Sequence, residues 1–314
     1  MNIPILPEQA SLGAREVDHL TIALCILTAF FVAITAGPIL YFAFKYRRGR
    51  VVDRRHGPIK TLRFEVTWTI MPVILALGLF AWSAKAYFEQ RHAPVNAMEI
   101  HVIGKQWMWK AQHPQGKREI NALHLPVGVP VKMLMTSQDV IHSFFIPAFR
   151  MKQDVLPHRY TTEWMVPTKI GTYHLFCAEY CGTDHSRMIG TVTVMSKAEY
   201  EQWLTTGEQA ESPVLAGARL FQQLGCSGCH VGSNVVRAPQ LTGVYGSVVP
   251  LQDGRSVIAD ERYLRDSILL PGAEIVAGYD PVMPSFQGRI SEEELMALTA
   301  YLKSIGQKEG GGAP

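Results

Sequence analysis

Two long apolar stretches constrain this chain of 314 residues more than any other feature. Leu20 to Phe44 runs for 25 residues without a charged side chain, and Val66 to Ala84 runs for 19. A helix that crosses a bilayer needs about 20 mostly apolar residues, so each stretch predicts a membrane-spanning helix. The first stretch is too long for the apolar part of a cleaved signal peptide, and no small-residue cleavage pattern clearly follows it.

The segment between the two stretches predicts their orientation. From Lys45 to Arg63 it holds one acidic residue, Asp53, and eight basic ones: Lys45, Arg47, Arg48, Arg50, Arg54, Arg55, Lys60 and Arg63. Short cytoplasmic loops carry an excess of Lys and Arg, so this loop is expected inside and both ends of the chain outside. The net charge of +3 gives no support for a nucleic-acid partner, and the basic loop lies between two spans. We therefore expect membrane lipid around the helices and no nucleic acid.

A cluster of soft metal ligands lies within twelve residues, in the run Cys177-Ala-Glu-Tyr-Cys181-Gly-Thr-Asp-His185-Ser-Arg-Met188. Thiolates and a thioether combined with imidazole select copper, zinc or iron–sulfur clusters. A structural zinc site usually draws on Cys-x2-Cys pairs, whereas these two cysteines are four apart. Two thiolates could bridge two coppers, with a second imidazole from His142 and the carbonyl of Glu179 completing the set. The alternative is a disulfide between the two cysteines, which an oxidising compartment would permit.

A second cysteine pair lies in the run Gly225-Cys226-Ser-Gly-Cys229-His230. Cys-x-x-Cys-His is the signature of c-type haem attachment, in which the cysteines bind the haem covalently and the histidine binds the iron. The alternative is a thioredoxin-like redox pair, which would lie near a βαβ pattern. No such pattern surrounds the motif, so we predict covalent haem c.

The sixth haem ligand is predicted to be a methionine, which raises the reduction potential. Met283, in the Pro-rich run Pro281-Val-Met283-Pro-Ser-Phe, is the candidate. Met296 competes with it, but lies inside a predicted helix from Glu292 to Ile305 and is expected to pack there. Ser291 is the predicted N-cap of that helix.

Between the membrane stretches and the haem motif, the pattern changes to short runs of β-branched and aromatic residues bounded by Gly and Pro. Such runs predict strands. About 100 residues of short strands favour a small sandwich or a Greek-key barrel. The predicted strand runs are Glu99–Gly104, Val129–Met135, Glu163–Val166, Gly171–Phe176 and Gly190–Met195.

The pattern Cys-x-Glu-x-Cys-Gly-x-x-His-x-x-Met, preceded by His-Ser-Phe, resembles the CuA site of cytochrome c oxidase subunit II. The resemblance implies a cupredoxin fold and a binuclear copper centre. It also implies that the Glu179 carboxylate binds a magnesium ion shared with subunit I. The implied copper ligands are His142, Cys177, the carbonyl of Glu179, Cys181, His185 and Met188.

Three further segments resemble the same family. Glu65, in Glu-x-x-Trp-Thr-x-x-Pro, stands where the family has the entrance of a proton path, although a carboxylate at a membrane boundary is often simply solvated. Trp107, in Gly-Lys-Gln-Trp-Met-Trp, corresponds to the residue for electron entry, whereas Trp109 is expected to pack. The segment with Asp154 resembles one that faces the large subunit, with His158 where the family has Gly.

The C-terminal part resembles a class I cytochrome c, and the whole chain resembles subunit II of a caa3-type haem–copper oxidase. This implies an oxidoreductase subunit that relays electrons from a cytochrome c or another periplasmic donor through haem c and CuA to subunit I. That subunit reduces oxygen to water and pumps protons, together with the other oxidase subunits. The alternatives are the small subunit of a CuA-type nitric oxide reductase and a free-standing, membrane-anchored copper–haem electron carrier.

The expected fold class is a multidomain protein of the bacterial inner membrane. It combines a two-helix transmembrane hairpin, an all-β cupredoxin (Greek-key) domain and an all-α class I cytochrome c domain, both domains being periplasmic. The predicted boundaries are a periplasmic segment at 1–18, the hairpin at 19–90 (helices at about 20–44 and 65–88, loop at 45–63), the cupredoxin domain at 97–198, a linker at 199–213 that begins helical, the cytochrome c domain at 214–306 and a flexible tail at 307–314.

Overall fold

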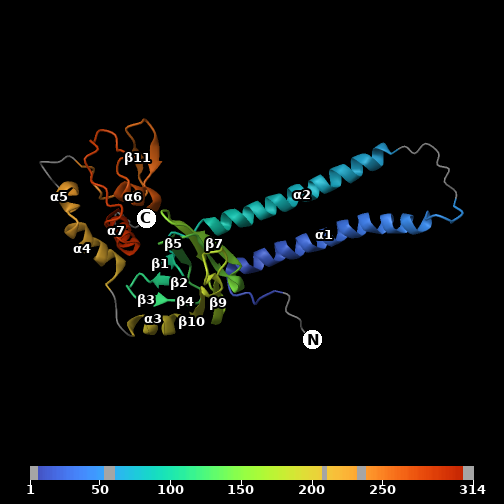
Figure 1. The fold of residues 1–314 in the computed structure, drawn as a ribbon, viewed down its shortest axis with the longest axis horizontal. Coiled ribbons are helices and arrows are strands. Elements are labelled where there is room, and N and C mark those ends of the chain that lie inside the picture. Colours follow the sequence, from blue (N-terminus) through green and yellow to red (C-terminus); the bar gives the residue numbers. More distant parts are fainter. Residues whose placement is uncertain (1–5, 53–60, 207–210, 232–237, 307–314) are drawn as a thin grey trace, which may run out of the picture.

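The computed structural model describes residues 6–52, 61–206, 211–231 and 238–306. These residues form two long helices, a β-sandwich (Met98–Met195, the β domain) and a helical C-terminal domain (Pro213–Gly306), as Figure 1 shows. The predicted tail at 307–314, part of the basic loop and part of the linker lie outside the described residues. The elements are α1 Leu12–Lys45, α2 Leu62–Arg91, β1 Met98–Lys105, β2 Met108–Gln112, β3 Arg118–Ile120, β4 Ala122–Pro126, β5 Val131–Ser137, β6 His142–Ile146, η1 Pro147–Phe149, β7 Met151–Val155, β8 Thr161–Met165, β9 Gly171–Cys177, η2 His185–Arg187, β10 Ile189–Met195, α3 Lys197–Thr205, α4 Pro213–Gln223, α5 Ser227–His230, β11 Val248–Pro250, β12 Ser256–Ile258, α6 Glu261–Leu269 and α7 Glu292–Gly306.

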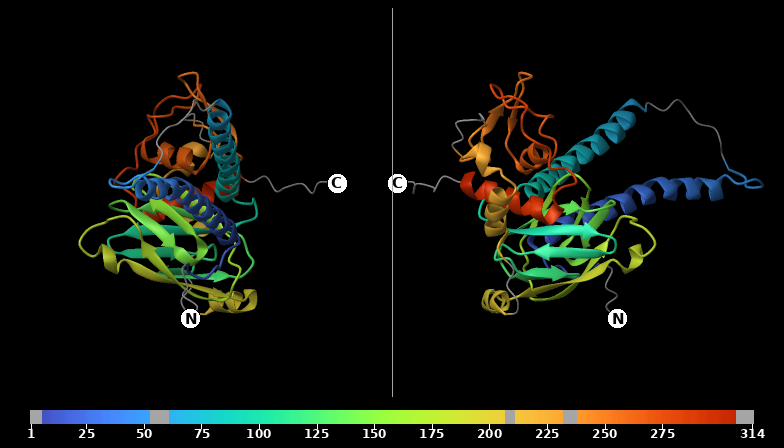
Figure 2. Two further views of the ribbon diagram at one scale, coloured as in Figure 1. Left: turned by 90° about the vertical axis from the view of Figure 1, so that its right-hand side faces the viewer. Right: turned by 60° about the vertical axis from the view of Figure 1, so that its left-hand side comes forward.

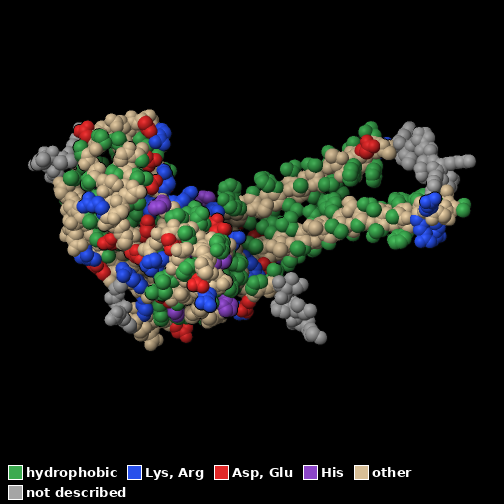
Figure 3. Space-filling model, in the orientation of Figure 1, with side chains coloured by type: hydrophobic (Ala, Val, Ile, Leu, Met, Phe, Trp, Pro, Cys, Tyr) green, Lys and Arg blue, Asp and Glu red, His purple; other side chains and the backbone are tan. Residues whose placement is uncertain are grey.

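The first two helices project from the β domain as a hairpin. Both are long and apolar enough to cross a membrane, and their apolar windows are not buried within the protein. Figure 3 shows apolar side chains along most of the hairpin, whereas charged side chains gather over the globular part and at the end with the loop. Such a surface suits hydrocarbon rather than water, which makes the chain a membrane-anchored protein.

The predicted helix starts, near residues 20 and 65, were too late. Helix α1 begins at Leu12, inside the predicted periplasmic segment 1–18, because the Ser11 side chain accepts a hydrogen bond from the Ala14 amide and caps the helix. Asp18 is buried in α1 because Arg150 of the β domain donates hydrogen bonds of 2.7 and 2.9 Å to its carboxylate. This ion pair joins the β domain to the end of the hairpin that lies next to it.

The β domain consists of two five-stranded sheets with strand orders β3-β2-β1-β5-β8 and β4-β10-β9-β6-β7. The pairs β1–β5 and β4–β10 are parallel, and the other pairs are antiparallel. All five predicted strand runs are confirmed as β1, β5, β8, β9 and β10. The remaining strands were missed because they are short or carry polar residues at an exposed edge, as β7 does with Lys152 and Asp154.

The turn after β7 contains His158, where the resembling family has Gly. His158 adopts a φ of +62°, in the left-handed region that Gly enters most easily. Histidine enters this region more readily than most residues. The turn therefore keeps the backbone form that a Gly would take, and Arg159 follows it on the surface.

The linker predicted at 199–213 begins helical, as expected, but its first part is fixed to the β domain. Helix α3 starts with a capping box between Ser196 and Glu199. The hydroxyl of Tyr200 lies 2.7 Å from His113, whose other ring nitrogen lies 2.8 Å from Glu119. Glu119 also contacts the ring of His124, at 2.5 Å, so one carboxylate joins two imidazoles beneath α3. The connection to the next domain is therefore shorter than predicted.

The C-terminal domain packs α4 across α7, with α6 and a small hairpin of β11 and β12 completing it. Gly217 permits the crossing, because a Cβ atom at this position would lie 2.0 Å from the carbonyl oxygen of Ala297. The predicted N-cap of α7 is confirmed: Ser291 and Glu294 exchange hydrogen bonds. Figure 2 shows this domain seated on the β domain, away from the free end of the hairpin.

We predict that Glu119 makes the stability of the protein depend on pH. Burial opposes its ionisation, but hydrogen bonds from His113 and His124 outweigh this and lower its pKa from 4.5 to about 2. A lowered pKa adds stability that is present above pH 4.5 and is lost as the pH falls towards 2. Glu119→Gln should cost about 1–3 kcal/mol at pH 7. It should also flatten the loss of stability between pH 5 and pH 3.

The measurement is chemical unfolding of the full chain in detergent, followed by tryptophan fluorescence at each pH. Glu201→Gln, an exposed position on α3, is the matched control. A Glu119→Gln variant that loses as much stability on acidification as the unmutated chain would contradict this role.

Candidate metal centre and haem pocket

The soft ligands converge because strands β6, β9 and β10 are neighbours in one sheet. Cys177 ends β9, and the register that pairs Phe144 with Cys177 brings His142, at the start of β6, beside it. The loop after β9 returns through η2 to β10, where the amide of Cys177 donates a 3.1 Å hydrogen bond to the carbonyl of Met188. Pairing of distant strands thus brings the predicted ligands together.

The donor atoms lie within a few ångströms of one another. The sulfurs of Cys177 and Cys181 are 3.8 Å apart, which is too far for the 2.05 Å bond of a disulfide, and both cysteines are free. The alternative disulfide is therefore absent from this structure. Nδ1 of His142 lies 3.9 Å from the Cys177 sulfur, and Nδ1 of His185 lies 3.5 Å from the Cys181 sulfur. The Cys181 sulfur is 3.7 Å from that of Met188, and the Cys177 sulfur is 3.2 Å from the carbonyl oxygen of Glu179.

The two thiols differ in acidity. Burial opposes ionisation of Cys177, but a hydrogen bond from His142 and further backbone hydrogen bonds lower its pKa to about 6. Burial and the charge of Cys177 raise the pKa of Cys181 to about 12. One thiolate therefore forms readily and opposes the second. A bound cation removes this opposition, since a coordinating thiol is deprotonated outright.

The donor set fits the implied binuclear copper centre. Both thiols face the same small space, one imidazole lies beside each thiol, and the thioether and the carbonyl close the set. His142, Cys177, Cys181 and Met188 are all buried, so water has little access to these atoms. Soft sulfur ligands with imidazole suit copper.

Two residues that support the loop, Asp139 and Gln106, were not predicted from the sequence. The carboxylate of Asp139 lies 2.8 Å from Nε2 of His142, so it orients the ring with Nδ1 towards Cys177. The other oxygen of Asp139 accepts a 2.8 Å hydrogen bond from the amide of Gln106, whose side chain donates to the carbonyl of Cys181. Asp139 stands only three residues before His142, and an acid so close to a candidate ligand is a signal that could have identified it.

The two tryptophans differ as expected. Trp109 is buried in the core and meets His142 and Phe144 edge to face. Trp107 is half-buried and packs against the same core. Its ring lies beside the loop from Cys177 to Met188, which we call the metal loop: a Cβ atom at Gly182 would be 3.3 Å from the ring.

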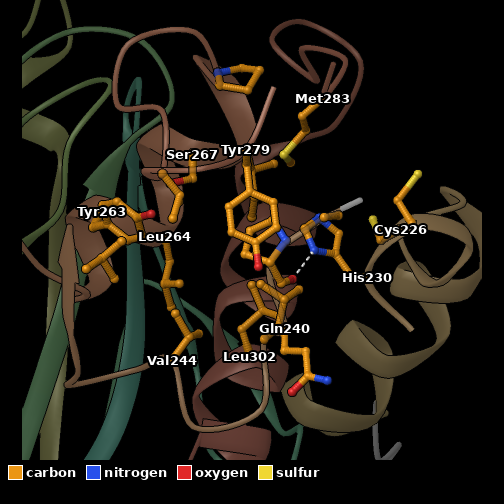
Figure 4. Close-up of a pocket in the computed structure, with 18 of the residues that line it drawn as sticks. Cys226, His230, Gln240, Val244, Tyr263, Leu264, Ser267, Tyr279, Met283 and Leu302 are labelled. Carbon is orange, nitrogen blue, oxygen red and sulfur yellow. Dashed lines mark hydrogen bonds between the residues drawn. The ribbon is translucent and has the colours of Figure 1, made fainter. Parts of the chain in front are cut away.

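The haem motif opens onto the large cavity of the C-terminal domain, of about 480 Å³. Figure 4 shows His230 and Met283 pointing into this cavity from different segments, with Cys226 beside helix α5. The rest of the wall is mostly apolar and includes Phe221, Leu264, Phe286, Leu298 and Leu302. Two thiols, an imidazole, a thioether and an apolar cavity suit covalent haem c.

The hydrogen bond that His230 makes through Nδ1 leaves its Nε2 atom available to bind a metal. Its Nδ1 lies 2.8 Å from the carbonyl oxygen of Pro239, a contact that the sequence did not reveal. This leaves Nε2 without its proton, in the form that binds iron. Met296 does not line the cavity and instead packs with Ile103 and Leu134 of the β domain, so its expected packing role is confirmed.

Two predicted site residues lie apart from these clusters. Glu65 is exposed in the first turn of α2, at the end of the hairpin far from the β domain (Figure 1). The Glu179 side chain is exposed on the metal loop. The structure thus brings the predicted copper ligands together and the predicted haem ligands together, but leaves these two carboxylates at the surface.

We predict that Asp139 controls metal affinity through His142. Asp139→Asn weakens the hydrogen bond that orients the imidazole, and loss of such a contact typically lowers metal affinity by about 10–100-fold. Competition with a copper chelator measures the affinity of the full chain. Asp253→Asn, exposed in the C-terminal domain, is the control. Equal copper affinity in the Asp139→Asn variant and the unmutated chain would rule out the positioning role.

Comparisons with known families agree with this division of sites. A family model described as "Cytochrome C oxidase subunit II, periplasmic domain" matches residues 117–195, which include the metal loop. A model described as "Cytochrome c" matches residues 214–306, which include the haem motif. These matches imply copper and haem c, and they confirm the predicted cupredoxin-like and cytochrome c folds.

Curated relatives extend the likeness. "Cytochrome c oxidase subunit 2" of Alkalihalophilus pseudofirmus is 26% identical over 92% of this chain and 86% of its own length. The protein of the same description from Thermostichus vulcanus is 29% identical, over 68% of this chain and 82% of its own length. "Probable cytochrome c oxidase subunit 2" of Streptomyces coelicolor is 31% identical, over 54% of this chain and 67% of its own length. The chain therefore belongs to the cytochrome c oxidase subunit II family, part of an oxidoreductase complex, and carries a cytochrome c domain after the subunit II domain.

Proposed function

We propose that this chain relays single electrons from a periplasmic donor, such as a cytochrome c, through haem c and binuclear CuA to the haem–copper subunit of an oxidase of the caa3 type. That subunit would reduce oxygen to water and pump protons. The observation that supports the proposal is the presence of two clusters of sulfur and imidazole donors in one chain, on domains packed against each other.

Side chains of this protein would hold the haem and the copper pair and shield them from water. When bound, haem c and the copper pair supply one-electron chemistry. Cys226 and Cys229 would hold the haem covalently, with His230 and Met283 towards its iron. The buried thiols of the metal loop would hold copper, and Asp139 keeps His142 in place. Buried ligands suit electron transfer because little solvent has to reorient when the charge changes.

Three further residues complete the proposal. The half-buried ring of Trp107, beside the metal loop, would be the point of electron entry to the copper pair. Glu65 would stand at the entrance of a proton path into subunit I. The exposed carboxylate of Glu179 would bind a magnesium ion shared with that subunit, because hard cations prefer oxygen ligands.

The basic loop supports an orientation with both globular domains on the periplasmic side of the inner membrane. Covalent haem attachment belongs to that side in bacteria, so two independent features favour the same placement. Oxidase subunit I and other oxidase subunits would then cover the apolar hairpin, whose side chains face outward.

Purification in mild detergent tests the proposed function. A tagged chain is expected to carry a large haem–copper subunit with it, in a complex that oxidises reduced cytochrome c and consumes oxygen. A complex that reduces nitric oxide but not oxygen would favour a nitric oxide reductase instead. A 35.0 kDa chain that purifies alone with both cofactors would favour a free-standing carrier.

Glu65 and Glu179 yield paired predictions in that complex, each variant serving as the control for the other. Glu65→Gln should slow oxygen reduction several-fold, but should not change the binding of a manganese ion that has been substituted for magnesium. Glu179→Gln should release the manganese at least ten times more readily, because it removes a charged oxygen ligand. Manganese electron paramagnetic resonance and oxygen consumption are the two measurements. Unchanged turnover in Glu65→Gln would indicate that Glu65 is simply a solvated carboxylate at the membrane boundary. Unchanged manganese binding in Glu179→Gln would show that the Glu179 carboxylate is not a ligand.

A further inference from the structure

Helix α7 separates the haem pocket from the β domain and has a different role on each face. Leu298 and Leu302 line the haem pocket. Met296, on another face of the helix, is only 1% exposed and packs against the β domain. Residues three and four apart on a helix share a face, which explains why these two sets separate. One helix thus contacts both the haem pocket and the neighbouring domain.

The contact of α7 with the β domain has an apolar centre. Met296 packs with Ile103 of β1 and Leu134 of β5, and Tyr160 joins them. The guanidinium of Arg265, from α6, lies 5.1 Å from the centre of the Tyr160 ring. Two of the elements that line the haem pocket, α6 and α7, therefore reach across to the β domain.

The strand beneath this contact touches the metal site on its other side. Gly104 follows Ile103 in β1, and a Cβ atom on Gly104 would lie 2.9 Å from Cδ2 of His142. Only a residue without a side chain lets the imidazole approach the strand so closely. One helix and one strand thus lie between the haem pocket and a copper ligand.

Four charges at the same interface form a closed ring. Glu99 and Lys132 face each other on the parallel strands β1 and β5, 3.2 Å apart. Lys132 reaches Glu261 of α6 at 2.8 Å, and Lys303 of α7 reaches Glu261 at 3.0 Å and Glu99 at 2.6 Å. Each charge therefore contacts two opposite charges. We call this set the four-charge ring.

The four-charge ring positions the two domains relative to each other, and neither domain contributes a net charge to it. Each domain contributes one acid and one base, so each keeps its own ion pair and the two pairs fit together in only one orientation. The four side chains are 13–22% exposed. Burial opposes ionisation of Glu261, but Lys303 and Lys132 lower its pKa to about 2, so the ring remains charged at neutral pH.

A second polar contact ties α7 to the support of the copper ligand. Glu293, in the first turn of α7, accepts hydrogen bonds from Lys110, at 2.9 Å, and from the side chain of Gln138, at 2.6 Å. Gln138 is followed by Asp139, whose carboxylate orients His142. The docked helix α7 thus contacts the residue next to Asp139, which orients His142.

We propose that the contact around Met296, Ile103 and Leu134 is the route by which an electron passes from haem c to the copper pair, and that the four-charge ring is the positioning device that holds the domains together for this step. The inference rests on the proposed function of the chain. One electron leaves the haem and one arrives at the copper pair, with no bond made or broken. The contacts described between the domains do not involve Trp107, which leaves that residue for donors outside the chain.

The test exchanges two charges within one domain. Glu99→Lys combined with Lys132→Glu preserves the ion pair of the β domain but places like charges opposite both partners of the C-terminal domain. Like charges across an interface disfavour association strongly, so the docked fraction should fall by at least about tenfold. Adding Glu261→Lys and Lys303→Glu restores every opposite pair. The control exchange is Glu211→Arg with Arg219→Glu, an exposed pair within the C-terminal segment.

Two measurements on the assembled complex read the result. The first follows electron transfer from haem c to copper after photoreduction. The second follows oxidation of Met296 by peroxide with mass spectrometry, which detects undocking without any cofactor chemistry. Met135, fully buried in the core of the β domain, reports whether that domain stays folded.

The double exchange should slow the transfer at least about tenfold, in proportion to the docked fraction, and expose Met296 while Met135 stays protected. The fourfold exchange should restore both readouts, and the control should change neither. Exposed Met296 with an unchanged transfer rate would overturn the route, and protected Met296 would overturn the positioning role. Absence of copper or covalent haem from the unmutated complex would instead contradict the proposed function, and cofactor analysis before the kinetics detects this separately.

Discussion

The pairing of strands β6 and β9 is the constraint on which the metal centre depends. It brings His142 beside Cys177 although 35 residues separate them in the chain, and the return into β10 brings Met188 to the same place. Because β9 alternates buried and exposed side chains, a shift in register by one residue would turn the ligands to the wrong face. The fold therefore specifies the metal loop before any metal binds.

Electrostatics make this preformed site dependent on a cation. The charge of a first thiolate and the burial of the loop oppose a second thiolate, and a bound cation would remove this opposition. The cavity of the C-terminal domain is apolar, and the proposed haem would depend instead on covalent attachment and on a hydrogen bond from His230. The two domains would thus hold their cofactors by different physical means.

The parts that could be predicted from the sequence are those whose residues are close together in the chain. The loop from Cys177 to Met188, the haem motif and the helix after Ser291 are local patterns, and the structure has them where they were expected. The ion pair between Asp18 and Arg150 joins residues 132 positions apart. The pair between Glu99 and Lys303 joins residues 204 positions apart. Neither leaves a periodic pattern, because such contacts depend on how whole domains pack.

The contents of the purified chain test the central claim most directly. Metal analysis and haem determination should find two copper ions and one covalently bound haem on each chain. The haem should remain attached under denaturing conditions, and the copper pair should give one mixed-valence paramagnetic signal. Two independent mononuclear copper signals, zinc in place of copper, or a haem released on denaturation would contradict the account.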